Sequence, residues 1–155
     1  MNTPKRRHPA LLISGALILI VGVVSVIQRD AIAGLILRGG DTSLTGPAAQ
    51  NSPEAKLAMD FLGALRTTDT LAMSRLATAE QIDRMRDEIA HPTADAQQLR
   101  AMMLEDLPAD QANLQSTIKS LQTHEKLAVV TFETKANTWF VQLALVDGVW
   151  KVSGF

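Results

Sequence analysis

The sequence predicts an α+β fold, in which one N-terminal transmembrane helix precedes a helical segment packed on a curved four-stranded antiparallel sheet. Three observations predict it. An apolar run without charges covers residues 10–27, apolar residues recur at helical spacing between residues 53 and 107, and from about Leu114 they alternate. Helical side chains repeat about every 3.6 residues and strand side chains every two, so this change of period separates helices from strands. Helices followed by an antiparallel run of strands define the α+β class.

The apolar run from Ala10 to Ile27 predicts the transmembrane helix. Its eighteen residues contain no charge and no amide, and as a helix they span roughly 27 Å, about the thickness of the hydrocarbon layer. Lys5, Arg6 and Arg7 stand before the run. The positive-inside rule therefore keeps residues 1–9 in the cytoplasm and places the rest of the chain across the membrane.

Two other interpretations of this run stay open. Ala31-Ile32-Ala33 has the small-x-small form of a signal-peptidase site, so the run also fits a cleaved signal peptide. Against this, the run exceeds the usual length of about 7 to 15 residues, and the charged pair Arg29-Asp30 stands just before the cut. The third interpretation is a buried helix of a soluble protein. We expect an uncleaved anchor.

A second apolar segment, Ala31–Leu37, follows the charged pair and is too short to cross the bilayer again. It fits a continuation of the helix into the headgroup layer, which gives a membrane segment over residues 10–37. It also fits a contact strip for a neighbouring membrane subunit, because exposed apolar surface usually marks a binding site. In that case the partner-contact candidates are Leu35, Ile36 and Leu37.

The expected domain covers residues 53–155 and follows a linker over residues 38–52, which is rich in Gly, Ser, Thr and Pro. Ser52-Pro53-Glu54 predicts a helix start, with Ser as the N-cap and Pro in the first turn. Three more helices are expected from near Thr68, Thr78 and Thr93. The residues expected to face inward are Ala58, Phe61, Leu62 and Leu65, then Leu71 and Leu76, then Ile82, Met85 and Ile89, then Leu99, Met102, Met103 and Leu107.

The last two strands are expected to form a hairpin around Asp147-Gly148, a preferred two-residue turn. The turn fixes the register, and alternation then assigns the side chains to a strongly apolar face and a mixed face. The predicted pairs are Val146 with Val149, Leu145 with Trp150, Leu143 with Val152 and Val141 with Gly154. The apolar face holds Trp139, Val141, Leu143, Leu145, Trp150 and Val152, and the mixed face holds Phe140, Gln142, Ala144, Lys151, Ser153 and Phe155.

The connection before this hairpin is predicted from the same apolar face. A loop centred on Ala136-Asn137 pairs Phe132 with Val141, which continues the apolar face into the preceding strand. The same register pairs Val130 with Leu143. A slip by one residue would turn Glu133 into the core, so we expect no such slip.

The first predicted strand runs from Leu114 to Thr123. Ile118 and Leu121 are both apolar but differ in parity, so they cannot face the same side of a regular strand. This pattern predicts a bulged strand or an edge strand, and it completes a meander of four strands.

Composition and residue types narrow the function. Residues 53–155 hold ten Lys or Arg and fourteen Asp or Glu. This mildly acidic balance argues against nucleic acid as a partner, because binding to phosphates needs a basic face. The chain has no cysteine, which excludes disulfides, thiolate zinc sites and a cysteine nucleophile. It has no tyrosine, and the positions of its three histidines do not favour catalysis or metal binding. Those histidines are His8, His91 and His124. Asp60 is the one acid on the first helix that merits testing as a base, although a solvated carboxylate is the favoured interpretation. We expect no metal, no cofactor and no enzymatic activity.

Three stretches of the domain stand in a characteristic order: Ala58-x-x-Phe61-Leu62-x-Ala64-Leu65 followed by Thr68-Asp69, then Leu127–Phe132, then Asp147-Gly148-x-Trp150-Lys151-Val152. Taken together they resemble the nuclear transport factor two-like superfamily, and in particular its small extracytoplasmic bacterial domains that follow a signal or an anchor. The resemblance covers about residues 53–155. It implies a cone of helices against a strongly bent sheet, with a pocket at the open end. Members often have an early hairpin between helices, which this sequence lacks.

The resemblance and the anchor together imply an accessory or scaffold subunit of a complex in the bacterial inner membrane, with a cytoplasmic N-terminus and a periplasmic domain. The expected partner is a membrane-protein subunit or a second copy, and Phe140 and Phe155 are contact candidates because members often dimerise through the open sheet face. The alternative is a small-molecule-binding module with an apolar cone pocket. An isomerase or hydrolase with Asp60 as base is a third hypothesis. The residues that fit core packing or pocket lining are Phe61, Leu65, Met102, Phe132, Trp139 and Trp150.

Overall fold

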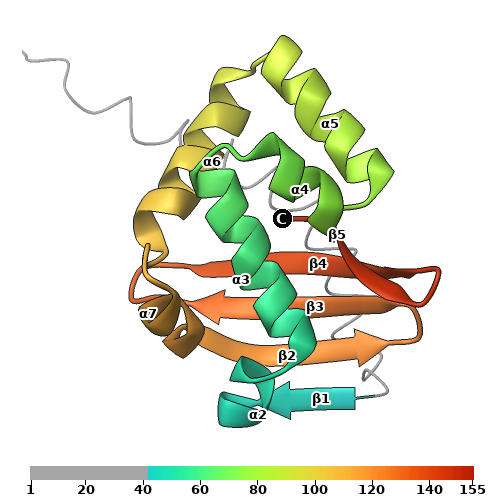
Figure 1. The fold of residues 1–155 in the computed structure, drawn as a ribbon. Coiled ribbons are helices and arrows are strands. Elements are labelled where there is room, and N and C mark those ends of the chain that lie inside the picture. The colour runs from blue at the N-terminus through green and yellow to red at the C-terminus, as the bar shows by residue number, and fades with distance from the viewer. Residues whose placement is uncertain (1–41) are drawn as a thin grey trace, which may run out of the picture. The chain divides into compact units, whose positions relative to one another are not determined.

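The computed structural model describes residues 42–155, which form an α+β domain (Figure 1). The membrane segment predicted over residues 10–37, with Leu35, Ile36 and Leu37, lies outside the described residues and stays a prediction. Within residues 42–155, no helix is both long enough and apolar enough to span a bilayer. The α+β prediction is confirmed, but the described sheet has five strands, so the predicted number of four is wrong.

All five strands are antiparallel to their neighbours and follow the sheet order β1-β2-β3-β4-β5. In Figure 1 the helices lie on one side of this sheet, and α3 crosses over it. The helices are α2 (Gly46–Gln50), α3 (Pro53–Arg66), α4 (Thr70–Leu76), α5 (Ala79–Ala90), α6 (Ala94–Asp106) and α7 (Gln111–Ser116). The strands are β1 (Thr42–Thr45), β2 (Ile118–His124), β3 (Leu127–Glu133), β4 (Thr138–Val146) and β5 (Val149–Gly154).

Helix α3 is the central element of the core. The Oγ of Ser52 accepts a hydrogen bond from the N–H of Ala55 at 3.0 Å, and Pro53 occupies the first turn, as the sequence predicts. The hydroxyl satisfies an amide that would otherwise have no partner at the helix start. The predicted inward stripe is confirmed, because Ala58, Phe61, Leu62 and Leu65 are all buried.

The fifth strand, β1, lies in the segment predicted as a linker. Leu44 of β1 is opposite Leu121 of β2 and packs against the core. Helix α2 follows, with Pro47 in its first turn and Ala49 fully buried. The linker prediction is therefore wrong for residues 42–50. A strand of four residues with one large apolar side chain is too short to show a period.

The β4–β5 hairpin has the predicted register near its turn. Asp147 and Gly148 have φ angles of 51° and 79°, the left-handed pair that a type I′ turn needs. An Asp-Gly pair accepts this conformation at little cost, which is why the turn could be read from the sequence. The confirmed pairs are Val146 with Val149, Leu145 with Trp150, and Leu143 with Val152.

An irregularity in this hairpin changes the face of the last residue. The sequence predicts that Gly154 pairs with Val141, but in the structure it pairs with Gln142. The difference arises because one extra residue on β5 interrupts the alternation. Phe155 consequently lies on the helix side of the sheet, where its ring centroid is 5.3 Å from that of Phe61. The prediction that Phe155 belongs to the mixed face is wrong.

The predicted register between β3 and β4 is wrong by two residues. Phe132 pairs with Trp139, and Val130 pairs with Val141, because the loop consists of residues 134–137 only. A shift of two keeps the parity of every side chain, so the predicted apolar face is retained. Buried on this face are Val130, Phe132, Val141, Leu143 and Val152.

Strand β2 begins later than predicted. Leu114 belongs to helix α7, and β2 starts at Ile118. The register shifts between Ile118 and Ser120, which is the predicted bulge, and it allows Ile118 and Leu121 to be buried together. The edge alternative is wrong, because β1 pairs with the other side of β2.

The helix caps are as predicted, whereas four residues expected to face inward are exposed. Thr78 and Thr93 each accept a hydrogen bond from the amide three residues ahead, at the starts of α5 and α6. The helical period defines an apolar face, but it does not say whether another element covers that face. Met85, Met103 and Leu107 are buried, and the exposed residues are Leu71 (61%), Ile89 (57%), Met102 (41%) and Leu99 (38%).

Candidate functional site

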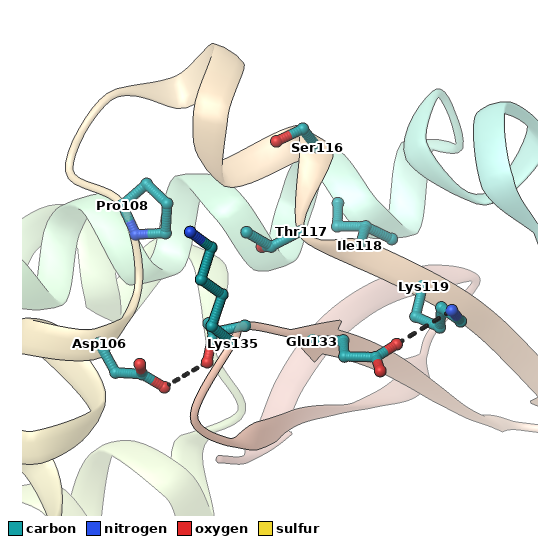
Figure 2. A pocket seen from close by; sticks show the side chains of 9 residues that line it. Asp106, Pro108, Ser116, Thr117, Ile118, Lys119, Glu133 and Lys135 are labelled. Atoms are coloured by element: carbon teal, nitrogen blue, oxygen red, sulfur yellow. Dashed lines mark hydrogen bonds and ion pairs between the residues drawn. The ribbon is translucent and has the colours of Figure 1, made fainter.

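A surface cavity lies where the end of α6, the α7–β2 connection and the β3–β4 loop come together (Figure 2). Its volume is about 700 Å³, which is within the range of small-molecule sites. Such sites are mostly apolar, whereas seven of the nine residues that line this cavity are polar or charged. The lining residues are Asp106, Pro108, Ser116, Thr117, Ile118, Lys119, Glu133, Thr134 and Lys135.

Asp106, the last residue of α6, has three hydrogen-bond donors on one oxygen. Its Oδ2 accepts from Trp139 Nε1 at 2.6 Å, from Thr134 Oγ1 at 2.7 Å and from Asn137 Nδ2 at 3.1 Å. All three donors belong to the start of β4 or to the loop before it. The carboxylate therefore ties the end of α6 to the β3–β4 loop.

These neutral donors hold the pKa of the Asp106 carboxyl below its usual value, because they stabilise the charged form. The indole of Trp139 contributes most and Thr134 next, while partial burial acts in the opposite direction. A general base that works near neutral pH needs a pKa close to that pH. The lowered pKa therefore suits a structural carboxylate better than a base.

Thr134 organises the loop that presents these donors. Its Oγ1 accepts hydrogen bonds from the N–H groups of Asn137 at 3.0 Å and Ala136 at 3.3 Å. Its own N–H donates to the carbonyl oxygen of Asn137 at 2.9 Å. A hydroxyl that bonds to the backbone just ahead commonly closes a turn in this way. The closed loop holds Thr134 and Asn137 beside Asp106.

The charges that line the cavity balance one another. The Nζ of Lys119 is 3.1 Å from the Oε2 of Glu133, and both side chains are at least half exposed, so this ion pair contributes little free energy. Lys135 forms no ion pair within the described residues, and Figure 2 shows its side chain extending toward Pro108. The lining of the cavity therefore carries two acidic and two basic side chains.

Helix α3 supports the wall of the cavity from behind. The guanidinium of Arg66 donates to the carbonyl oxygens of Leu107 at 3.0 Å and Pro108 at 3.4 Å. Asp60, the acid singled out as a candidate base, accepts a hydrogen bond from Gln111 Nε2 at 3.2 Å and so joins α3 to α7. Both contacts fix the positions of the elements that they join.

The residues predicted to line a pocket or the core are mostly core residues. Phe61, Leu65 and Phe132 are buried, and Trp139 and Trp150 are half-buried and pack against the core. Met102 is exposed and separate from them. Trp139 reaches the cavity of Figure 2 only through its hydrogen bond to Asp106. The structure thus brings five of the six residues together.

The residues predicted to contact a partner are on different faces. Phe140 is half-buried on the sheet face opposite the helices, and Phe155 packs against Phe61 on the helix side. His8 lies outside the described residues. His91 is exposed, with its Nδ1 3.1 Å from a carboxylate oxygen of Asp87. Residues 42–155 contain no group of three His, Cys, Asp or Glu side chains that could hold a metal ion.

The sequence reasoning missed Asp106, Thr134 and Lys135. A local signal exists only for Thr134, since Thr-x-x-Asn between two strands is typical of a side-chain-closed turn. Asp106 and Trp139 are separated by 33 positions in the sequence. Their contact depends on the fold bringing the end of α6 to the start of β4, and no local pattern in the sequence predicts this.

Residues 42–155 form an α+β domain with its helices on one face of an antiparallel sheet. No family model matches this chain, and no curated protein or solved structure matches it significantly. The resemblance to the nuclear transport factor two-like superfamily therefore stays a prediction from the residues.

Proposed function

We propose that this protein is a non-catalytic accessory or scaffold subunit of a membrane protein complex. In this proposal a single N-terminal helix holds it in the bacterial inner membrane, and the domain of residues 53–155, extended by β1 and α2, lies in the periplasm. The partner is another membrane-protein subunit or a second copy of the chain. The proposal joins the predicted anchor to a surface feature of the described domain.

The observation that carries the proposal is a set of exposed apolar side chains on α5 and α6. An ion pair between Arg100 and Glu88, with 2.6 Å between nitrogen and oxygen, joins the two helices. Ile89 and Leu99 are sequence neighbours of this pair, and Met102 is one helical turn beyond Leu99. Apolar side chains that cluster at the surface mark sites of protein–protein contact more often than single exposed ones do.

The cavity of Figure 2 adds support of a different kind. Asp106 is held in its charged form by Trp139 and Thr134, and Lys119 is paired with Glu133. These groups join elements of the domain to one another. This use of charged side chains fits a rigid binding domain better than an active site, where perturbed acids and bases are expected to face a substrate.

The test compares two variants of the full chain purified in a mild detergent. Leu99→Asp places a charge within the exposed apolar set, and Gln98→Asp places the same charge at the adjacent exposed position. We expect mass spectrometry to identify a stoichiometric co-purifying subunit that Leu99→Asp loses and Gln98→Asp retains. A wild-type chain that leaves its native membrane without any partner contradicts the proposal.

One observation favours the second candidate, a small-molecule-binding module. Gln81 is 4% exposed, and its Oε1 has no hydrogen-bond partner in the described part of the chain. A buried amide oxygen without a partner costs about 1 to 3 kcal/mol. A ligand that donates a hydrogen bond to this oxygen would remove the cost.

A thermal-shift screen of ligands that carry a hydrogen-bond donor tests this second function. A ligand at a hundred times its dissociation constant stabilises the folded state by about 2.7 kcal/mol. We expect the shift to be absent from Gln81→Leu, which removes the acceptor. Without ligand, Gln81→Leu is expected to unfold at the same temperature as the wild type or higher, because it removes an unsatisfied group.

A further inference from the structure

One end of the sheet carries the large hydrophobic side chains that the described strands expose. Leu127, Val146 and Val149 are 49%, 44% and 56% exposed. The register places them together, because Leu127 is opposite Ala144, two positions from Val146, and Val146 is opposite Val149. By alternation, all three point to the sheet face opposite the helices. We call these three residues the exposed corner.

The chain enters the described domain at this same end of the sheet. Thr42, the first residue of β1, pairs with Thr123 near the end of β2. The β2–β3 turn and the β4–β5 turn lie at the same end, on the right of Figure 1. The predicted anchor ends at Ile27, and the chain from there to Thr42 spans at most about 50 Å when extended. In the anchored chain this length sets an upper limit on the distance between this end of the domain and the bilayer.

We propose that the exposed corner contacts the lipid surface of the membrane that holds the anchor, an inference that rests on the proposed anchoring. Aliphatic side chains gain free energy when they leave water for the apolar part of the interface. The tether also keeps lipid at a high effective concentration next to the corner. A contact too weak to recruit a free domain is therefore sufficient to orient a tethered one.

The charges of the two turns determine the kind of lipid contact. Glu125 and Lys126 lie in the β2–β3 turn and Asp147 in the β4–β5 turn, so the formal charge of the turns is −1. Attraction to anionic lipids requires clustered Lys and Arg, which these turns lack. The contact is aliphatic and shallow, with the turn charges in the hydrated headgroup layer. It is therefore insensitive to added salt and to the fraction of anionic lipid.

The absence of cysteine from the chain allows a direct test. Single variants Leu127→Cys and Val149→Cys of the full chain carry an environment-sensitive fluorophore, and Ala136→Cys is the matched control. Ala136 is exposed in the β3–β4 loop, at the opposite end of the sheet. The labelled proteins are reconstituted into vesicles of phosphatidylcholine and phosphatidylethanolamine, with nitroxide-labelled lipid as quencher.

We expect nitroxide lipid to quench the probes at Leu127→Cys and Val149→Cys several-fold more than the probe at Ala136→Cys. Added salt leaves this difference unchanged. Adding Val146→Ser to Leu127→Cys lowers the quenching of the probe at Leu127→Cys, and circular dichroism confirms that this double variant is folded. Equal quenching at all three positions overturns the inference. Shielding of these probes from water that increases with the ratio of protein to lipid also overturns the inference, because a second copy of the chain then covers the exposed corner.

Carbonate extraction of the same vesicles separates the two proposals. A chain that carbonate removes from the vesicles has no anchor, and this outcome overturns both the proposed function and the lipid contact. A chain that stays in the vesicles with water-exposed probes at Leu127→Cys and Val149→Cys overturns the lipid contact only. The scaffold proposal then stands on the partner test with Leu99→Asp.

Discussion

The indole N–H of Trp139 donates a hydrogen bond of 2.6 Å to the carboxylate of Asp106, and this contact joins the last turn of α6 to the start of β4. Trp139 also packs against the core. One side chain thus contributes apolar area to the core and a polar contact at its edge, as tryptophan commonly does. The position of the β3–β4 loop depends on the same carboxylate, because Thr134 and Asn137 donate hydrogen bonds to the oxygen that Trp139 contacts.

Replacement of Asp106 by Asn is expected to lower the free energy of unfolding by about 1 to 2 kcal/mol. Hydrogen bonds to a charged acceptor are stronger than those to a neutral one, and the amide oxygen of the substituted side chain is a neutral acceptor. Urea denaturation of the full chain in detergent, followed by circular dichroism, measures the loss. The neighbouring exposed acid gives the control, since Glu105→Gln is expected to change stability by less than about 0.5 kcal/mol. Equal losses in the two variants would show that the network contributes nothing.

The pH dependence of this difference follows from the direction of the Asp106 pKa shift. Folding lowers the pKa of Asp106 from its ordinary value of 3.8, so the unfolded chain binds more protons there than the folded chain when the pH is low. The stabilisation is therefore complete above the ordinary pKa and is lost as pH falls through the lowered folded-state pKa.

We expect the stability difference between wild type and Asp106→Asn to be constant from pH 7 to about 5 and to shrink below about pH 4. Urea denaturation at a series of pH values measures it. Asp110, whose pKa is also lowered, chiefly by the backbone N–H of Asn113, is present in both proteins and cancels in the difference. A difference that grows as the pH falls contradicts the assigned direction.

Phe155 and Phe140 form a natural pair for testing the irregularity in β5. Both side chains are half-buried, but Phe155 packs on Phe61 and Phe140 lies on the opposite face of the sheet. Phe155→Ala is expected to cost about 2 kcal/mol, because it removes apolar area and an aromatic contact from the core. Phe140→Ala is expected to cost less than about 1 kcal/mol. The reverse order in urea denaturation would place Phe155 on the face that regular alternation predicts.

The sequence predicts those parts of the fold that local chemistry determines. Ser52 caps α3 and Asp147-Gly148 closes the last hairpin, because a cap or a turn requires particular residue types at particular positions. The face of each apolar residue in β3 and β4 was also predictable, since parity survives a register error of two. What parity cannot give is the number of residues in the β3–β4 loop.

The remaining differences concern contacts between distant segments. Leu71 and Ile89 belong to apolar stripes, yet both are exposed, because burial depends on a neighbouring element and not on the helix alone. The face of Phe155 depends on a single extra residue in β5. The Asp106 network joins segments that only the folded chain brings together. None of these features has a local sequence signal.

Strand β1 is one of the elements that the sequence did not predict, and a matched pair of variants tests it. Leu44 packs against the core opposite Leu121, whereas the adjacent Ser43 is exposed. Leu44→Asp moves a carboxylate into an apolar contact and is expected to lower the free energy of unfolding by about 1 to 2 kcal/mol. Ser43→Asp places the same charge on the same strand, facing the other way, and is expected to cost less than about 0.5 kcal/mol.

A linker over residues 38–52 predicts a different result, with no effect from either substitution. Hydrogen exchange distinguishes the two cases independently of stability. If β1 pairs with β2, Leu44→Asp weakens the protection of amides in β2, the strand that β1 separates from solvent at the sheet edge. Protection in the β4–β5 hairpin stays unchanged, because β2 and β3 lie between it and β1, and local opening at one edge of a sheet need not reach the other.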